Sequence, residues 1–472
     1  MSDAAFDPVT RTWVPREHPG AVPVPALRGV LVRDEDSVRW AADDFGHVVQ
    51  HRPWAVLRPG GAADVAAIVA FAGEVGLSVA ARGAGHSTYG QAQNAGGIVI
   101  DMTCLDEVAV SAGRVRAQAG ALWSTVLDAT LPQGGTPGVL TDYLPTTVGG
   151  TLTVGGVGGA SHRHGLQVDG VVELDVVTGR GRQVSCSPER NQRLFDAVRA
   201  GLGQCGIITS ATLGLIPAPT RVRCYRLYYQ DLAAYLADQR RLVAADRFDY
   251  LEGQILSAGP GSWCYLLEAA AYYTPPMTPP AAPLKRLDHE RDEVEDTSYR
   301  QFARRMEPGE AVLRASGEWL HPHVWLNVFL PEDATASVVG AVLAELTATD
   351  LGNSGLGLLY PLRTDRLHAP LTRIPDTDLV WLFALLRTAG ADDPTASATL
   401  VEANRAILDR AVASGATAYP INTLPMSPAD WETHFGPRWP QLLAAKAEFD
   451  PHGILAPGHG ISAIPSRAHP AW

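Results

Sequence analysis

Two glycine-rich stretches, residues 83–91 and 147–159, constrain this chain more than any other feature. Glycine loses the most conformational entropy on folding, so such stretches persist where the backbone must approach something closely. Backbone amides without side chains in the way can bind a phosphate or a flat ring. Both stretches lack lysine, no Walker motif is present, and no Gly-x-Gly-x-x-Gly lies between an early strand and a helix. We therefore expect a cofactor held by backbone amides, with two ligand-free turns as the simpler alternative.

The composition favours a large globular protein of two or three domains. The chain has 472 residues, of which 46% are hydrophobic and 19% are charged, and a domain typically contains roughly 100–200 residues. The formal net charge of −12 argues against a surface that binds nucleic acid. No stretch reaches the roughly 18 apolar residues that a membrane helix needs. We expect neither a nucleic acid nor a membrane as a partner.

The cysteines and the first residues bear on the cellular compartment. The five cysteines are widely spaced and form no Cys-x-x-Cys pair, which favours reduced thiols. Residues 1–20 are polar and lack a basic start followed by an apolar run, so no secretory signal is expected. These features predict a cytoplasmic protein.

Apolar periodicity predicts strands and helices on both sides of a boundary at residues 217–219. Apolar residues at helical spacing predict a helix that Asp64 caps and Gly76 ends. Residues 1–50 are expected to be irregular, and residues 141–165 to be a glycine-dense loop. We further expect strands at 55–59, 77–82, 98–102, 115–119, 171–178, 182–186, 206–215, 254–256, 264–273 and 325–330, and helices at 122–131, 191–199, 284–305, 335–348 and 395–414.

Three side chains are candidates for chemistry. A lone histidine is more often structural than functional, but His86 follows glycines at a strand end, where a bound group can reach it. An imidazole nitrogen is a nucleophile that can carry a covalent bond to a cofactor. Asp142, beside the second glycine stretch, and Glu268, within an apolar strand, are acid–base candidates. Glu268 lies either on a solvated edge or in a cavity with a raised pKa, and composition does not separate these alternatives.

The histidine pairs do not predict a metal site. His162 with His164, and His321 with His323, form His-x-His pairs. No cysteine, aspartate or glutamate completes a zinc ligand set at a suitable spacing. We therefore expect no metal.

Short motifs follow one another from Asp44 to Ile461. They are Arg82-Gly83-Ala84-Gly85-His86-Ser87 with Gly90-Gln91-Ala92, Thr141-Asp142-Tyr143-Leu144, Thr147-Val148-Gly149-Gly150, Gly201-Leu202-Gly203-Gln204, Tyr250-Leu251-Glu252-Gly253, Trp325-Leu326-Asn327 and Tyr360-Pro361-Leu362. In this order they resemble motifs of the cytokinin dehydrogenases, flavin oxidoreductases of the vanillyl-alcohol-oxidase-like superfamily, and the resemblance covers some nine tenths of the chain. The motifs at 82–92 and 201–204 are shared across much of the superfamily, whereas others are more particular to the cytokinin branch.

The resemblance implies an α+β fold of two domains. A PCMH-type FAD-binding domain is expected to contain residues 1–218 and the returning segment 420–472. A substrate domain, residues 219–419, is expected to have an antiparallel sheet covered by helices. FAD is expected between the two domains, and His86 is implied to form a covalent bond to the flavin ring.

The resemblance also assigns individual site residues. Asp142 is implied to be the catalytic acid–base group, and Glu268 to be a catalytic glutamate at the substrate entrance. Trp325, Asn327 and Leu362 are implied to contact the substrate. The implied cofactor contacts are Gly83, Ala84, Gly85, His86, Ser87, Gln91, Asp142, Thr147, Gly149, Gly150, Thr153, Ile208, Tyr419 and His459.

The implied reaction is oxidation of the secondary amine of an N6-substituted adenine, a cytokinin. Asp142 is expected to take the amine proton while the adjacent carbon gives a hydride to the flavin. The resulting imine hydrolyses to adenine and an aldehyde, and a quinone or oxygen is the expected electron acceptor.

Departures from the family's motifs keep two alternatives open. Residues 154–156 are less polar than expected, His459 replaces a glutamine, and the segment 252–262 is short. A related FAD-linked oxidase acting on another amine or alcohol in secondary metabolism is one alternative. A binding protein that has lost redox activity is the other. The sequence indicates neither the preferred N6 side chain nor an oligomeric state.

Overall fold

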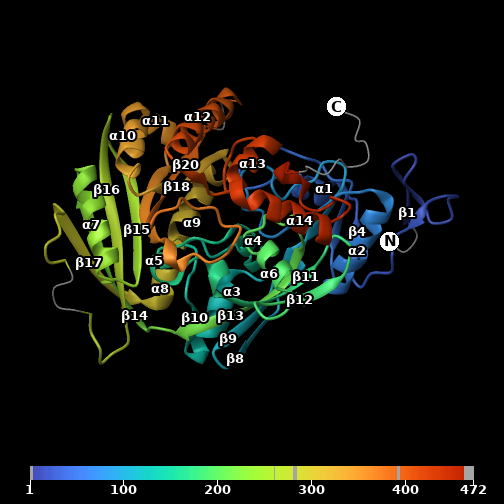
Figure 1. Ribbon diagram of the computed structural model, residues 1–472, viewed down its shortest axis with the longest axis horizontal. Helices are drawn as coiled ribbons and strands as arrows, with labels where there is room; N and C mark the ends of the chain where they lie inside the picture. The colour runs from blue at the N-terminus through green and yellow to red at the C-terminus, as the bar shows by residue number, and fades with distance from the viewer. Residues whose placement is uncertain (1–3, 260, 280–283, 391–393, 462–472) are drawn as a thin grey trace.

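The computed structural model describes residues 4–259, 261–279, 284–390 and 394–461. Helices and sheets are mixed, with the first strands at one end of the molecule and a large sheet at the other (Figure 1). The predicted α+β architecture of two domains is confirmed. The exact boundaries, 1–218, 219–419 and 420–472, stay a prediction.

Residues 1–50 were expected to be irregular, but the described part of this segment contains four strands and a helix. In the described part, Phe6 packs edge-on against Trp13, with ring centroids 5.1 Å apart, and lies 5.8 Å from Trp54. These aromatic contacts stabilise elements that are too short to show periodicity. The elements are β1 (Ala4–Asp7), β2 (Thr12–Pro15), β3 (Val22–Pro23), β4 (Val30–Val32) and α1 (Glu35–Ala41).

A four-stranded sheet of order β4-β5-β7-β6 carries the first glycine-rich stretch. Its three parallel strands are buried on both faces, because α2 packs on one face and α1 on the other. Gly76 ends α2 in the left-handed region, with φ of 71°. The new elements are β5 (Ala55–Arg58), α2 (Ala62–Val75), β6 (Val79–Arg82) and β7 (Ile98–Asp101).

A six-stranded sheet follows, with order β12-β11-β13-β9-β8 and with β10 paired to β13. The strands predicted at 171–178 and 182–186 are present and pair with each other, since Leu174 of β11 lies opposite Cys186 of β12. The strands are β8 (Val108–Ser111), β9 (Arg114–Gln118), β10 (Gly135–Pro137), β11 (Val171–Val177), β12 (Gln183–Cys186) and β13 (Ile207–Pro217). The helices among them are α3 (Trp123–Thr130), α4 (Val148–Val154), α5 (Ser161–His164) and α6 (Gln192–Val198).

An antiparallel eight-stranded sheet has the order β17-β14-β16-β15-β19-β20-β18-β21. Helices α7, α10 and α12 cover one face of it (Figure 1). Its strands are β14 (Arg221–Tyr229), β15 (Tyr250–Gly259), β16 (Ser262–Tyr273), β17 (Arg291–Ser298), β18 (His323–Pro331), β19 (Leu356–Arg363), β20 (Leu379–Thr388) and β21 (Thr417–Ala418). Its helices are α7 (Leu232–Ala244), α8 (Tyr299–Ala303), α9 (Glu307–Ser316), α10 (Thr335–Glu345), α11 (Ala348–Leu351) and α12 (Pro394–Ala413).

The last described segment returns to the first half of the chain. Helices α13 (Pro428–Phe435) and α14 (Trp439–Phe449) precede a residue, Leu455, that bridges to Val79 of β6. The buried Lys446 ammonium donates to Asp450 Oδ2 at 2.9 Å and to the Gln204 carbonyl at 3.1 Å. These contacts hold the returning segment beside the strand that leads into the first glycine-rich stretch.

The helix predicted at 284–305 is wrong over most of its described length. Residues 291–298 instead form β17, an edge strand whose side chains are mostly exposed. Charged side chains protect an edge strand from pairing with another chain. Arg223 of β14 pairs across the sheet with Asp296 of β17 at 2.8 Å. The dense run of charged residues therefore correctly predicted that this segment is exposed to solvent, but the prediction that it is a helix was wrong.

The loop predicted at 141–165 is also only partly correct, because it contains helices α4 and α5. Glycine disfavours helices by about 1 kcal/mol relative to alanine. Here a Cβ on Gly149 would lie 2.7 Å from the Ala119 Cβ. Close packing of α4 against the end of β9 therefore requires glycine and overrides its low helix propensity.

Candidate functional site

A cavity of about 360 Å³ lies between the first half of the chain and the sheet face opposite helices α7, α10 and α12. Loop 83–91, helix α4 and strands β18, β19 and β20 contribute to its walls. All fourteen residues that the resemblance assigns to the cofactor line it: Gly83, Ala84, Gly85, His86, Ser87, Gln91, Asp142, Thr147, Gly149, Gly150, Thr153, Ile208, Tyr419 and His459. The structure thus brings these residues together, while their individual roles stay predictions.

The side chain of Asp44 holds loop 83–91 in place by hydrogen bonds. Its Oδ2 accepts hydrogen bonds from the Gly90 amide at 2.7 Å and the Ser87 hydroxyl at 3.0 Å. Burial raises the pKa of Asp44 to about 6, although these hydrogen bonds oppose the shift. Asp44 began the stretch that resembles the family, but its anchoring role depends on a contact across more than 40 residues and was not predicted.

The backbone amides of residues 84–87, at the start of loop 83–91, are available to a ligand. Within the described chain, the backbone nitrogens of residues 84–87 donate no hydrogen bond to another protein group. A backbone donor without a partner is costly unless water or a ligand meets it. Successive free amides bind anions such as phosphates. This arrangement fits the cofactor expected from the sequence.

Close backbone contacts explain the glycines at the cavity wall. A Cβ on Gly83 would lie 2.0 Å from Thr147 Oγ1, so loop 83–91 meets the start of α4 with no room for a side chain. Of the described residues that line the cavity, Asp142 is the sole aspartate, glutamate, lysine or arginine. A bound diphosphate would therefore be held by backbone amides and hydroxyl groups. This agrees with the absence of lysine from the two glycine-rich stretches. This set of donors fits FAD.

His86 lies in an aromatic surround. Its ring centroid is 4.0 Å from that of Phe45, 4.7 Å from that of Tyr143 and 5.7 Å from that of Trp325. Its ring nitrogens make no hydrogen bond to a described protein group. Burial, followed by the positive charge that His323 can carry, lowers the pKa of His86 to about 3. The imidazole is therefore neutral near pH 7, with a nitrogen lone pair free to form a bond.

Asp142 is fixed by two residues that the sequence had not singled out for chemistry. Arg305 Nη2 donates to its Oδ1 at 2.7 Å, and the Tyr250 hydroxyl is also 2.7 Å from that oxygen. Burial by itself would raise the pKa of Asp142. The Arg305 charge and the hydrogen bonds outweigh burial and hold the pKa below its ordinary value, so the carboxylate is ionised.

Glu268 is buried beside this pair but lines neither described cavity. Its Oε2 accepts from Arg305 Nε at 3.0 Å, and its Oε1 lies 3.6 Å from Arg226 Nε. The solvated-edge alternative is therefore wrong for this side chain. Its assignment to the substrate entrance stays a prediction.

Strand alternation explains which β18 side chains face the cavity. Trp325 and Asn327 line it, whereas Leu326 and Val328 pack under the helices. Asn327 Nδ2 donates to the Ile421 carbonyl at 2.5 Å, which fixes the amide. Leu362 is fully buried in a neighbouring apolar cluster and does not line the cavity.

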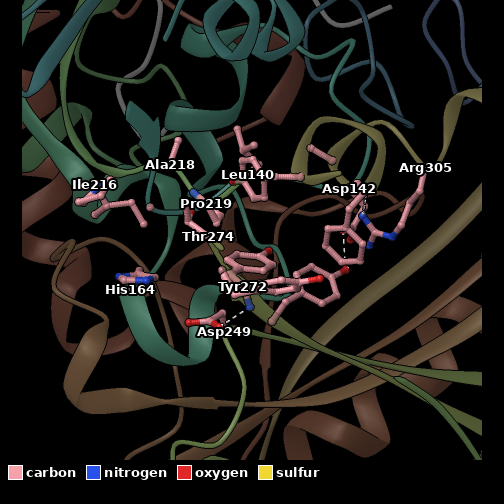
Figure 2. A pocket seen from close by; sticks show the side chains of 18 of the residues that line it. Leu140, Asp142, His164, Ile216, Ala218, Pro219, Asp249, Tyr272, Thr274 and Arg305 are labelled. Atoms are coloured by element: carbon pink, nitrogen blue, oxygen red, sulfur yellow. Dashed lines mark hydrogen bonds and ion pairs between the residues drawn. The ribbon is translucent and has the colours of Figure 1, made fainter. Parts of the chain in front are cut away.

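A second cavity of about 290 Å³ meets Asp142 from another side (Figure 2). Thr141 and Asp142 line both cavities, so they form part of the wall between them. Figure 2 shows Asp142 and Arg305 together at one side of this cavity, with His164 and Asp249 at the other. Aromatic side chains, including Tyr272, fill much of the wall.

The described residues contain no group of three or more histidine, cysteine, aspartate or glutamate side chains arranged to hold a metal ion. No helix in this part of the chain is long and apolar enough to span a membrane.

Family comparisons agree with the geometry of the site. Residues 219–262 and 257–462 match the family described as cytokinin dehydrogenase 1, FAD and cytokinin binding, and residues 53–187 match an FAD binding domain. The chain belongs to the cytokinin dehydrogenase family. As a member of the cytokinin dehydrogenase family, it is an FAD-dependent oxidoreductase that acts on a small molecule.

Similar proteins come from bacteria and plants. The chain is 43% identical to an uncharacterised oxidoreductase of the fasciation locus of Rhodococcoides fascians, over 92% of this chain and 100% of that protein. It is 37% identical to cytokinin dehydrogenase 10 of Oryza sativa subsp. japonica, over 91% of this chain and 88% of that protein. It is 35% identical to cytokinin dehydrogenase 2 of Arabidopsis thaliana, over 92% and 94% respectively.

A solved structure shares the fold of this cytokinin dehydrogenase family member. The 6-hydroxy-D-nicotine oxidase of Arthrobacter nicotinovorans superposes with a TM-score of 0.70. The two chains are 20% identical, and the match covers 91% of this chain and 96% of the other. At this identity the likeness supports the two-domain fold and carries no conclusion about the substrate.

Proposed function

We propose that this protein oxidises the secondary amine of N6-substituted adenines to an imine, which water then converts to adenine and an aldehyde. The observation that carries the proposal is the place of Asp142. It is the sole acidic residue among the described lining of the cavity that also contains His86, and it is held ionised by Arg305. An ionised carboxylate can accept the N–H of a secondary amine and then its proton.

The protein's own groups orient the substrate and hold its proton. Trp325 and Asn327 of β18 provide an aromatic surface and an amide on the wall contributed by the large sheet. When bound, FAD supplies the acceptor for the hydride that leaves the substrate carbon. The amine proton passes to Asp142, so the substrate loses two electrons and two hydrogens in total. We propose a quinone or oxygen as the acceptor that then regenerates the flavin.

We propose that His86 forms a covalent bond to the flavin ring. Support comes from its place in the cavity, its neutral imidazole and the lack of a described protein partner for its nitrogens. The surrounding rings of Phe45 and Tyr143 restrict its orientation. A fixed, neutral imidazole is a suitable nucleophile for this bond.

A second candidate is oxidation of a different amine or alcohol. The observation in its favour is that Glu268 and Leu362, both assigned to the substrate by resemblance, do not line the cavity. Two expected determinants of adenine recognition are therefore not at its surface. The R. fascians relative is itself described as uncharacterised.

The test is a product assay with N6-isopentenyladenine and a quinone acceptor. The expected result is equal amounts of adenine and aldehyde. A panel of other amines, alcohols and sugars is assayed in parallel. Faster oxidation of one of these would favour the second candidate, and no turnover of any adenine derivative with either acceptor would overturn the first.

A further inference from the structure

The second cavity gives Asp142 a face that a bound substrate does not cover. Thr141 and Asp142 line both this cavity and the larger one that contains His86, which we call the main cavity. The Asp142 side chain is 22% exposed although it pairs with Arg305. A substrate amine in the main cavity approaches the carboxylate from one side. The opposite side of the carboxylate adjoins the second cavity (Figure 2).

Charged side chains gather in the second cavity and not in the main one. Among the described residues that line the main cavity, Asp142 is the sole aspartate, glutamate, lysine or arginine. The second cavity also contains Arg305 and Asp249. His164 lies with Asp249 at the other side of this cavity from Asp142 (Figure 2). The more polar way out from the Asp142 carboxylate therefore leads through the second cavity.

The second cavity has the size and the polar groups that bound water needs. Its volume of about 290 Å³ is far above the roughly 10–15 Å³ that a single water requires. A buried water typically makes about three hydrogen bonds to polar groups that lack other partners. The Tyr272 hydroxyl and the ring nitrogens of His164 make no hydrogen bond to a described residue. The cavity can therefore hold a chain of water molecules that starts at Asp142.

His164 can carry a proton between this water and the solvent. The residue is exposed and ends the short helix α5, which lies against the cavity. Partial desolvation, followed by the Arg163 charge, lowers the pKa of His164. The imidazole is therefore neutral near pH 7, and one of its nitrogens can accept a proton. A neutral imidazole at the edge of a protein is a suitable proton carrier.

We propose that the second cavity is the path by which Asp142 returns its proton to solvent, with His164 as the proton carrier at the outer end. The proposal rests on the function assigned above to Asp142 and adds the place where this base is regenerated. The substrate N–H bond breaks in the main cavity, and its proton forms an O–H bond on Asp142. That O–H bond then breaks toward the second cavity, and the proton passes through water to His164 and to solvent. No electron moves in this step, and Asp142 is again an anion.

Arg305 favours the release of the proton on this side. Its Nη2 donates to Asp142 Oδ1 at 2.7 Å, and the side chain lines the second cavity and not the main one. The guanidinium stabilises the ionised form of Asp142, so the protonated carboxyl group readily loses its proton. The Arg305 Cζ lies 4.6 Å from the ring centroid of Phe302, and this contact holds the charge at the wall of the second cavity.

The first experiment needs no substrate and therefore tests the path separately from the proposed function. A crystal structure of the FAD-loaded protein shows whether the second cavity contains ordered water. We expect water molecules that join the Asp142 carboxylate to His164 by hydrogen bonds. A second cavity without water at Asp142 would overturn the proposal.

The second experiment compares flavin reduction with proton release in a single turnover without oxygen. N6-isopentenyladenine is mixed with the protein in weakly buffered solution, and the flavin absorbance and a pH indicator are recorded together. In the wild type the two signals should coincide. Ala218→Phe adds a ring at the wall of the second cavity, so flavin reduction should keep its rate while the proton appears later. The matched control, Ala233→Phe, places the same ring on the exposed side of α7 and should keep the two signals together.

His164→Gln tests the proton carrier. The proton should again appear later than flavin reduction, and imidazole added to the solution should shorten the delay. Imidazole would not repair a merely structural defect. A delay in Ala218→Phe alone would overturn the role of His164, and a delay in neither variant would overturn the whole path. If no adenine derivative reduces the flavin of the wild type, the proposed function fails, while the crystal structure still decides whether water connects Asp142 to solvent.

Discussion

The imidazole of His86 stands edge-on to the ring of Phe45, at an interplanar angle of 85° and a centroid separation of 4.0 Å. Phe45 is in turn stacked on His323, with centroids 3.9 Å apart and an interplanar angle of 6°. The contact holds His86 by shape and leaves its nitrogens without a described protein partner. Positioning without hydrogen bonds suits a residue whose nitrogen must form a bond.

His86→Ala should release the flavin when the protein is denatured. Acid precipitation of the wild type should leave the yellow colour in the pellet, whereas the variant's colour should pass to the supernatant. The absorbance of both fractions is the measurement. His459→Gln is the matched control, because His459 lines the same cavity and its pellet should stay yellow. Colour in the His86→Ala pellet would contradict the proposed bond.

Asp142→Asn should lower kcat/KM by about 10²–10⁴-fold, the usual contribution of a general base. The amide keeps the shape of the side chain but cannot accept the substrate proton. Initial rates with N6-isopentenyladenine give the ratio, and the flavin absorbance shows that the cofactor is retained. Thr141→Val changes the adjacent wall residue and should cost much less. A loss of only a few-fold in Asp142→Asn would mean that another group takes the proton.

The sequence predicted the parts of the site that depend on local motifs. His86 and the glycines beside it come directly after strand β6 in the chain. The free backbone amides of residues 84–87 depend on no contact with a distant segment. Asp142 could be predicted because it adjoins the second glycine-rich stretch. Gly149 also lines the cavity, although its segment forms helix α4 and not the expected loop.

The electrostatic partners of Asp142 could not be predicted in the same way. Arg305 is 163 positions away, and it is the last residue of the segment 284–305, which was expected to be one long helix. Only the pairing of β17 with β14 and of β14 with β16 brings it to Glu268. Such contacts depend on sheet order, which hydrophobic periodicity does not contain. The exposed charged residues of β17 likewise did not indicate a strand, because only its pairing with β14 makes this segment part of the sheet.

The ion pair between Lys446 and Asp450 should contribute strongly to stability. Both side chains are almost fully buried, at 1% and 0% exposure. Lys446→Met leaves the Asp450 carboxylate buried without its cation and should lower the free energy of unfolding by about 3–5 kcal/mol. Urea unfolding gives this value.

The matched control is a surface ion pair that joins helix α6 to helix α14. Arg193 lies 2.9 Å from Glu448 of α14, with exposures of 71% and 44%. Arg193→Met should change the free energy of unfolding by no more than about 1 kcal/mol, because solvent screens exposed ion pairs. Equal losses in Arg193→Met and Lys446→Met would show that burial does not set the strength of the Lys446 pair.

His434 should make the protein less stable as the pH falls. Burial, and then the Arg373 charge, lower its pKa from 6.5 to about 3 in the folded state. Between these values the unfolded chain binds a proton that the folded chain does not, so the free energy of unfolding rises with pH and falls on acidification. The slope for one such group is about 1.4 kcal/mol per pH unit.

Urea unfolding between about pH 4 and pH 6 should therefore show a slope smaller by about this amount in His434→Gln. His18→Gln, which replaces an exposed histidine, is the matched control. A His434→Gln slope equal to that of the wild type would show that this imidazole is already protonated in the folded protein.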